Sequence, residues 1–139
     1  MKIGEWDSLG RARGLLQRQL GELDANELAT HVTVNPENGR QRILVATDVG
    51  LIEYTWGPSG SGSTDWLLHG NVYRWKSVRG LRLQTDAQLG EDARDARSIW
   101  RLVAEDPKIE LAADAVGLDR EAVEALLAFA RACLERAAG

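Results

Sequence analysis

The clearest pattern in the chain is a pair of apolar runs between residues 41 and 56. Ile43–Thr47 and Leu51–Trp56 are rich in β-branched, aromatic and other apolar residues, and Asp48-Val49-Gly50 separates them. Two such runs around a tight break predict a β-hairpin. The first run is apolar on both faces, which is typical of a strand that is covered on both sides.

Further strands are predicted before and after this hairpin. They are Thr30–Val34, Trp66–Trp75, Ser77–Thr85, Ile99–Glu105 and Lys108–Ala115. Turn-forming or polar stretches separate them, namely Asn35–Gly39, Gly57–Asp65, Asp86–Arg97 and Asp106-Pro107. Gly70 and Gly80 lie inside two of these strands, where glycine commonly marks a bulge or a bend. Such bends favour a sheet that curls toward a barrel.

The strongest helical signal lies in residues 119–137. Its apolar stripe consists of Val123, Leu126, Leu127, Ala130 and Leu134, widened by Phe129 and Cys133. We expect Asp119 to cap this helix and Leu118 to pack against Val123.

A weaker helix is predicted for residues 7–28, with apolar residues near helical spacing at Leu9, Ala12, Leu16, Leu20 and Leu23. Asp7 or Ser8 is the expected N-cap. Each of its glycines costs about 1 kcal/mol relative to alanine, so this helix needs packing to persist. Asp24–Asn26 is the expected break before the sheet.

Composition narrows the class of protein. A chain of 139 residues fits one domain, 1–139, and its net charge of −4 argues against a nucleic-acid or anionic-membrane binder. The single cysteine, Cys133, precludes an intrachain disulfide. Residues 1–9 carry no apolar run of the signal-peptide kind, and no segment approaches the roughly 20 apolar residues of a membrane span. We therefore expect a soluble cytoplasmic protein.

About seven strands followed by one amphipathic helix is an order typical of a mainly β, α+β fold in which the helix covers the open end of the sheet. The stretches that show this order most clearly are Ile43–Ile52, Tyr73–Leu81, and Lys108–Ala113 with the helix after it. In this respect the chain resembles the bacterial pleckstrin-homology-like (PH-like) family. The resemblance spans residues 30–137 and implies a curled antiparallel sheet or partly open barrel. Residues 1–28 would form an N-terminal helical extension.

The resemblance also implies a binding or assembly module without catalysis. Members that bind phosphoinositides gather basic residues in the first hairpin loop and adjoining strands, where this chain offers Arg40 and Arg42. Gly57–Asp65 has no basic residue, and Glu105 and Asp106 are acidic. We therefore expect no phosphoinositide binding and no strong membrane binding. Bacterial members of the family favour protein contacts or self-association.

An aromatic set is the most prominent group of candidate site residues. It consists of Trp56, Trp66, Tyr73 and Trp75. Burial in the core is the first interpretation, because aromatic side chains bury large areas. A ligand or peptide platform at the open end of the barrel is the second.

Other candidates for chemistry have simpler interpretations. His31 and His69 lie on separate predicted strands without metal-ligand spacing, so two satisfied sheet histidines are expected. Asp48 is expected to bond the backbone of its own turn, and Cys133 to be a buried small hydrophobe. No catalytic residue, metal or cofactor is expected.

The resulting hypothesis is a non-enzymatic PH-like module that binds a protein partner or itself. The alternative is a small-ligand or lipid-binding barrel that uses the Trp-rich surface. The leucine stripe of residues 7–28 needs a partner of its own. We expect it to dock on its own sheet, with a homodimer through this helix as the alternative.

Overall fold

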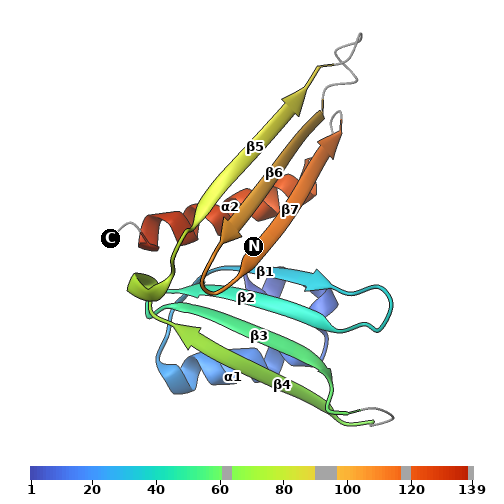
Figure 1. Ribbon diagram of the computed structural model, residues 1–139. Helices are drawn as coiled ribbons and strands as arrows, with labels where there is room; N and C mark the ends of the chain where they lie inside the picture. Colours follow the sequence, from blue (N-terminus) through green and yellow to red (C-terminus); the bar gives the residue numbers. More distant parts are fainter. Residues whose placement is uncertain (61–63, 90–96, 117–119, 138–139) are drawn as a thin grey trace. The chain divides into compact units, whose positions relative to one another are not determined.

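The computed structural model describes residues 1–60, 64–89, 97–116 and 120–137 (Figure 1). Backbone contacts divide the chain into two compact units, residues 1–74 and residues 75–139. Within its described residues, each unit contains one antiparallel sheet and one α-helix. The mainly β class with a helix toward each end is therefore confirmed, but the strands form two sheets and no closed barrel is found among the described residues. A single domain over 1–139 stays a prediction.

The first unit is a four-stranded sheet covered by a helix. Its elements are η1 (Ile3–Glu5), η2 (Asp7–Leu9), α1 (Ala12–Leu23), β1 (Glu27–Val34), β2 (Gln41–Thr47), β3 (Leu51–Pro58) and β4 (Trp66–Tyr73). The strands pair in the order β1-β2-β3-β4, so β1 and β4 are the two edges.

Helix α1 docks on its own sheet, as expected. Its buried residues Ala12, Leu16 and Leu20 share one core with alternate residues of β1, β2 and β3. Those strand residues are Val32, Ile43, Val45, Ile52, Tyr54 and Trp56. Ile3 and Leu9 from the short helical turns complete the same core. Leu9, Ala12, Leu16 and Leu20 of the predicted stripe are thus buried within the chain, and only Leu23 stays exposed, at 38%, which weakens the reason for a dimer through this helix. We call this side of the sheet the helix face.

The ends of α1 differ from the prediction. The helix begins at Ala12 because Gly10, at φ 52, interrupts the chain after η2. Asp7 belongs to η2, and no side chain caps α1, so the predicted caps are wrong. The break at residues 24–26 is confirmed, with Asp24 in the left-handed region at φ 55. Residues 27 and 28 therefore begin β1 instead of ending the helix.

The N-terminal segment covers the outer edge of β1. The backbone N–H of Thr30 donates to the Met1 carbonyl over 2.7 Å, and the Trp6 indole donates to the Thr30 carbonyl over 3.0 Å. The Ile3 N–H donates to a Glu27 carboxylate oxygen over 2.6 Å. The register of β1 also shifts between Glu27 and Ala29. This edge is therefore both capped and irregular.

Gly70 does not mark a bulge. The β3–β4 pairing runs without a shift from Leu51 opposite Tyr73 to Pro58 opposite Trp66. A Cβ at Gly70 would lie 2.5 Å from Cδ1 of Tyr54, its cross-strand partner. The glycine therefore makes room for the Tyr54 ring.

The second unit is a three-stranded sheet with the second helix. Its elements are η3 (Trp75–Ser77), β5 (Arg82–Gln88), β6 (Arg97–Ala104), β7 (Ile109–Val116) and α2 (Glu121–Ala137). Helix α2 contacts β6 and β7. Its buried residues are Val123, Leu126, Phe129, Ala130 and Cys133. Leu127 and Leu134 lie at the flanks of this stripe and are only half-buried. The sequence pattern places them in the stripe itself and Phe129 and Cys133 at its side, so the centre of the buried stripe is shifted toward Phe129 and Cys133. Leu118 and Asp119 lie outside the described residues.

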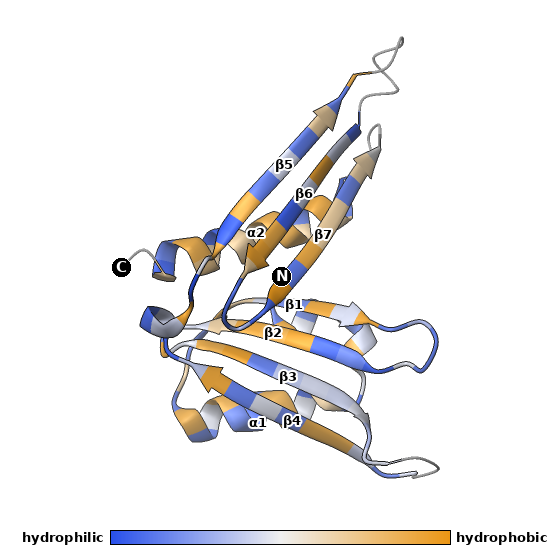
Figure 2. Ribbon diagram, viewed as in Figure 1, coloured by the Kyte–Doolittle hydropathy of each residue, from blue (hydrophilic) through white to orange (hydrophobic). Residues whose placement is uncertain are grey.

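The limits of β4 and of the strands of the second unit also differ from the prediction. The predicted strand 66–75 ends at Tyr73, and Trp75 opens η3. The predicted strand 77–85 begins only at Arg82, because Arg79 bridges Asp106 and Gly80 turns the chain at φ 69. Residues 86–88 and 97 extend strands, although their polarity indicated a loop. Figure 2 shows the mixed polarity of β5, whose residues are nearly all exposed, so no apolar pattern is required of it.

Candidate functional site

The hairpin β2–β3 sets the register of the first sheet. The hydroxyl of Thr47 accepts from the N–H groups of Val49 and Gly50 and donates to the Gly50 carbonyl over 2.7 Å. The turn is therefore held by the threonine. Asp48 accepts two hydrogen bonds from Asn26, over 2.7 and 2.8 Å. These bonds tie the turn to the segment between α1 and β1.

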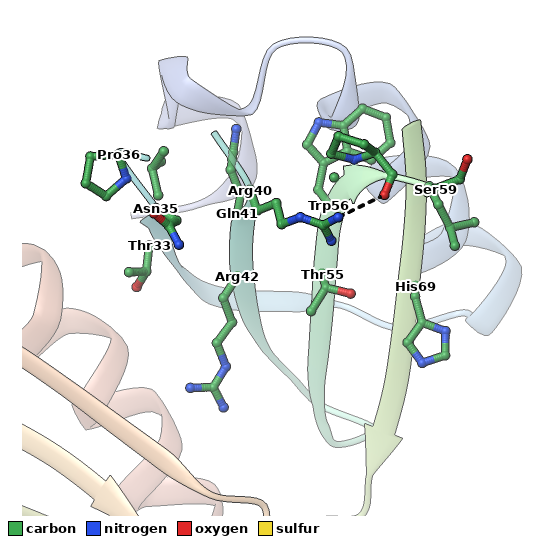
Figure 3. Close-up of a pocket in the computed structure, with 14 residues that line it drawn as sticks. Thr33, Asn35, Pro36, Arg40, Gln41, Arg42, Thr55, Trp56, Ser59 and His69 are labelled. Atoms are coloured by element: carbon green, nitrogen blue, oxygen red, sulfur yellow. Dashed lines mark hydrogen bonds between the residues drawn. The ribbon is translucent and has the colours of Figure 1, made fainter. Parts of the chain in front are cut away.

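Four side chains form a row across the face of this sheet opposite the helix face. Thr33, Arg42, Thr55 and His69 come one from each strand. Each is the direct cross-strand partner of the next. Figure 3 shows them in sequence from β1 to β4. Direct partners share one face of a sheet, so the row presents hydroxyl, guanidinium and imidazole groups together. We call this side the groove face.

An open groove of about 710 Å³ lies over this row, at the loop end of the strands. Its remaining lining residues are Val34, Asn35, Pro36, Arg40, Gln41, Trp56, Gly57, Pro58, Ser59 and Leu67. The β1–β2 turn bounds it on one side, where the Asn35 N–H donates to the Arg40 carbonyl over 2.8 Å. The predicted turn at residues 35–39 is thereby confirmed, with Gly39 at φ 73.

Arg40 lies across the end of the groove toward β3. Its guanidinium donates to the Pro58 carbonyl over 3.4 Å, as the dashed line in Figure 3 marks. A Cβ at Gly57 would lie 2.8 Å from Cγ of Arg40, so a larger residue there would displace the arginine. The glycine therefore sets the position of the arginine stem.

The charge of Arg42 is balanced from the neighbouring strand. Its guanidinium donates to a carboxylate oxygen of Glu53 through Nε, over 2.9 Å, and through Nη2. Both side chains are partly buried, at 31% and 22% exposure. A paired and partly buried guanidinium is held in one orientation. The groove therefore has one oriented cation in its floor and a second, Arg40, at its end.

The predicted aromatic set does not form one surface. Trp56 is 7% exposed and belongs to the core of the first unit, in line with the first interpretation. Its ring packs against Trp66, with centroids 5.4 Å apart. Tyr73 is half-buried at the end of β4, and Trp75 belongs to the second unit. Of the predicted site residues, the structure brings Arg40, Arg42 and Trp56 together in the groove lining.

The sequence interpretation missed Thr33, Thr55 and His69 as members of one site. Counting from the predicted turns misplaces each pair by one residue. A turn of residues 48–50 would set Thr55 opposite Ile43, whereas the register sets it opposite Arg42 because the first pair is Ala46 with Leu51. A turn of residues 35–39 would set Thr33 opposite Gln41, whereas the register sets it opposite Arg42 because the first pair is Val34 with Gln41. His69 follows only from the β3–β4 register, which its long connection leaves open.

The two remaining candidates for chemistry are His31 and Cys133. Burial, and next the positive N-terminal amine, lower the pKa of His31 to about 4. The Trp6 ring meets the His31 ring edge to face at 5.6 Å. Burial raises the pKa of the Cys133 thiol to about 12, so this thiol is a buried small hydrophobe as expected.

Within the described ranges, no three His, Cys, Asp or Glu side chains gather where they could hold a metal ion. No helix in the described part of the chain has the length and apolar character needed to cross a membrane. Compared with known proteins, the chain matches no family model, no curated protein and no solved structure.

Proposed function

We propose that this chain is a non-enzymatic, PH-like binding or assembly module that acts through protein–protein contacts, and that the groove over Thr33, Arg42, Thr55 and His69 receives a segment of its partner. The observation that carries this proposal is the groove itself, which is open and lies on regular strands. Rigid strands hold contact groups more precisely than loops do. The order of elements in the described residues, seven strands and then a helix, supports the PH-like assignment.

The chemistry of the groove suits a polypeptide segment. Protein interfaces combine apolar contacts with about one hydrogen bond per 100–200 Å², and arginine is enriched in them. The floor supplies hydroxyl, guanidinium and imidazole groups that can pair with peptide carbonyls and acidic side chains. Val34 and Leu67 lie along the groove, with 42% and 55% of their surfaces exposed. They supply apolar area that a partner can cover.

A non-enzymatic role is favoured by the composition of the lining. It holds no aspartate, glutamate or cysteine, and His69 is its only imidazole. General acid–base chemistry normally pairs a positioned base with an orienting group. The lining residues provide no such pair.

A small ligand in the same groove is the second candidate. The groove volume of about 710 Å³ lies within the range of roughly 300–1,000 Å³ typical of small-molecule sites. The openness of the groove favours the protein segment, because small-molecule sites usually enclose most of the ligand surface. The sequence suggested that a small ligand or lipid would bind at a Trp-rich surface. The burial of Trp56 argues against that surface as the binding site.

Thr55→Tyr tests the groove directly. Thr55 is exposed in the middle of the floor, and tyrosine is well tolerated in strands, so the substitution fills the groove without disturbing the core. Peptides selected from a displayed library on the wild-type chain are expected to bind it in calorimetry and to lose at least tenfold in affinity to Thr55→Tyr. Val49→Tyr, an exposed site in the hairpin turn, is the matched control and should bind normally.

The two candidates give different results. Peptides that bind wild type and Thr55→Tyr equally would refute the groove as the contact surface. If small molecules stabilise the wild type against heat, Thr55→Tyr abolishes this, and no peptide is selected, the second candidate replaces the first.

A further inference from the structure

Among the residues that the structure describes, the outer edge of strand β4 has no backbone partner. β4 is the last strand of the first sheet, where it pairs with β3. Every second residue of an edge strand directs its N–H and C=O away from its neighbour, which makes such an edge a template for another strand.

Natural proteins protect edges with charges, proline, bulges or covering segments. The sequence of β4, Trp-Leu-Leu-His-Gly-Asn-Val-Tyr, contains no proline, lysine, arginine or carboxylate, and its register with β3 is unbroken. Leu67 and Val72 expose 55% and 51% of their surfaces, and Figure 2 shows the apolar residues along this strand.

The other sheet edges are protected. β1 is capped by Met1 and Trp6 and has an irregular register. β5 carries Arg82 and Asp86, and β7 carries Glu110 and Asp114. The contrast marks β4 as an edge that is kept available for pairing.

We propose that a second copy of this chain pairs with β4, antiparallel and about a two-fold axis, with Gly70 opposite Gly70 of the second copy. The pattern of β4 matches itself in this register. Leu68 then lies opposite Val72 of the second copy on the helix face, and Leu67 lies opposite its Tyr73 on the groove face. Closed two-fold pairs are the commonest soluble oligomers.

Neighbouring registers fit less well. If the register shifts by one residue, each groove-face residue lies opposite a helix-face residue of the second copy. Directly paired residues must share one face of a sheet, so this register is excluded. Centring on His69 sets Leu67 opposite Asn71 and Leu68 opposite Gly70, so neither leucine meets an apolar residue of comparable size. Because the edge carries no formal charge, two identical edges also meet without the repulsion that opposed like charges cause.

The pairing completes the groove. Leu67 and His69 line its β4 side. In the Gly70-centred register the second copy adds Tyr73 beside Leu67 and Asn71 beside His69. This extends each groove by two side chains from the other subunit. Tyr73, a candidate from the sequence, thereby gains a role in the neighbouring site.

The first test is the mass of the full chain in solution, measured by light scattering during gel filtration. We expect twice 15.3 kDa for wild type. Val72→Lys should give the single mass and still unfold in one cooperative transition, because a half-exposed lysine protects an edge without entering the core. Val49→Lys, at a valine of 43% exposure outside β4, is the control and should keep the doubled mass.

A wild-type chain of single mass at its highest soluble concentration would overturn the proposal, as would a doubled mass in Val72→Lys. If the wild type is a monomer and binds an extended peptide that Val72→Lys does not bind, the edge of β4 pairs with a strand of another protein instead. Val72 does not line the groove and Thr55 does not lie on β4, so failure of the dimer and failure of groove binding are distinguishable.

Cysteine cross-linking tests the register. Direct cross-strand partners have Cβ atoms roughly 4.5–5.5 Å apart, close to disulfide geometry, whereas diagonal neighbours are about 7–8 Å apart. Mixing His69→Cys chains with Asn71→Cys chains under mild oxidation should therefore give a covalent dimer that neither variant gives alone. Efficient cross-linking of His69→Cys alone would overturn the Gly70-centred register. The buried Cys133 should not contribute, which wild type controls.

Discussion

α1 and α2 each cover an antiparallel sheet, but different parts of the chain hold them in place. α2 has 17 residues, and five of them form a continuous buried stripe. Glu121 and Glu124 lie in its first turn and Arg136 in its last, where each charge is favoured by the helix dipole. α1 has 12 residues, only three of which are buried, and no side-chain cap.

Neighbouring segments supply what α1 lacks. Ile3 and Leu9 complete its core, and the Arg13 guanidinium donates to the Trp6 carbonyl over 2.8 Å. Beyond its end, Asn26 is held by the carboxylate of Asp48. A helix with a strong stripe of its own can be recognised from its residues alone. A helix that depends on distant segments cannot, and its stability should respond to those segments.

The largest expected effect is in α2. Phe129 is fully buried, so Phe129→Ala should lower the free energy of unfolding by about 3–5 kcal/mol. Leu127→Ala, half-buried at the flank of the stripe, should cost clearly less. Denaturant titration followed by circular dichroism measures both. Equal losses would mean that Leu127 belongs to the centre of the stripe after all.

In α1 the corresponding residue is Leu16, which is also fully buried. Leu16→Ala should cost about 2–4 kcal/mol. Its neighbour Leu15 is 41% exposed, so Leu15→Ala should change stability by no more than about 0.5 kcal/mol. A similar loss in both variants would indicate that α1 packs on the sheet through a different face.

The N-terminal segment can be followed through His31. Its pKa is lowered from 6.5 to about 4 in the folded chain, so between these values the unfolded state binds a proton that the folded state does not. Stability from this source is therefore complete above pH 6.5 and is lost as the pH falls toward 4, by roughly 3 kcal/mol in total. Unfolding free energies of wild type and His31→Phe should converge or cross as the pH is lowered. Parallel profiles would contradict this.

The smallest expected effect sharpens the contrast between the helices. Gly14 and Gly21 lie within α1, and a Cβ at either position would meet no atom within 4 Å. Gly14→Ala and Gly21→Ala should each stabilise the chain by about 0.5–1 kcal/mol, through helix propensity alone. Gly70→Ala is the counterpart that should destabilise it, because its Cβ would clash with Tyr54. Thermal melts of the three variants decide this.

Much of the fold could be predicted where local pattern and tertiary structure agree. The hairpin around residues 48–50 carries two apolar runs and a tight break, and the strand near Ile109 and the helix near Phe129 carry the periodicity of the surface that they bury. The start of α1 could not be placed, since Gly10 and two short helical turns precede it. Nor could the full length of β5, since an exposed strand needs no apolar alternation.

The candidate site was only partly predictable for a related reason. Arg40, Arg42 and Trp56 attract notice by residue type, whereas threonines such as Thr33 and Thr55 are common in strands for reasons unrelated to binding. They form a group only because the strand register places both opposite Arg42, and the register depends on how the strands pair and not on the sequence of any one strand. The separation into two sheets was not visible in the sequence either, because the glycines that indicated curling serve other purposes, as Gly70 does for Tyr54.

The contact between Trp56 and Trp66 also makes this protein easy to monitor. Two indole rings with centroids 5.4 Å apart, inclined at 46°, are close enough for their electronic transitions to couple. Such coupling gives a paired positive and negative band in circular dichroism that single tryptophans lack. Because one ring comes from β3 and the other from β4, the band would vanish as soon as these strands separate. The first sheet thus carries an intrinsic optical probe of its own pairing, which needs no label.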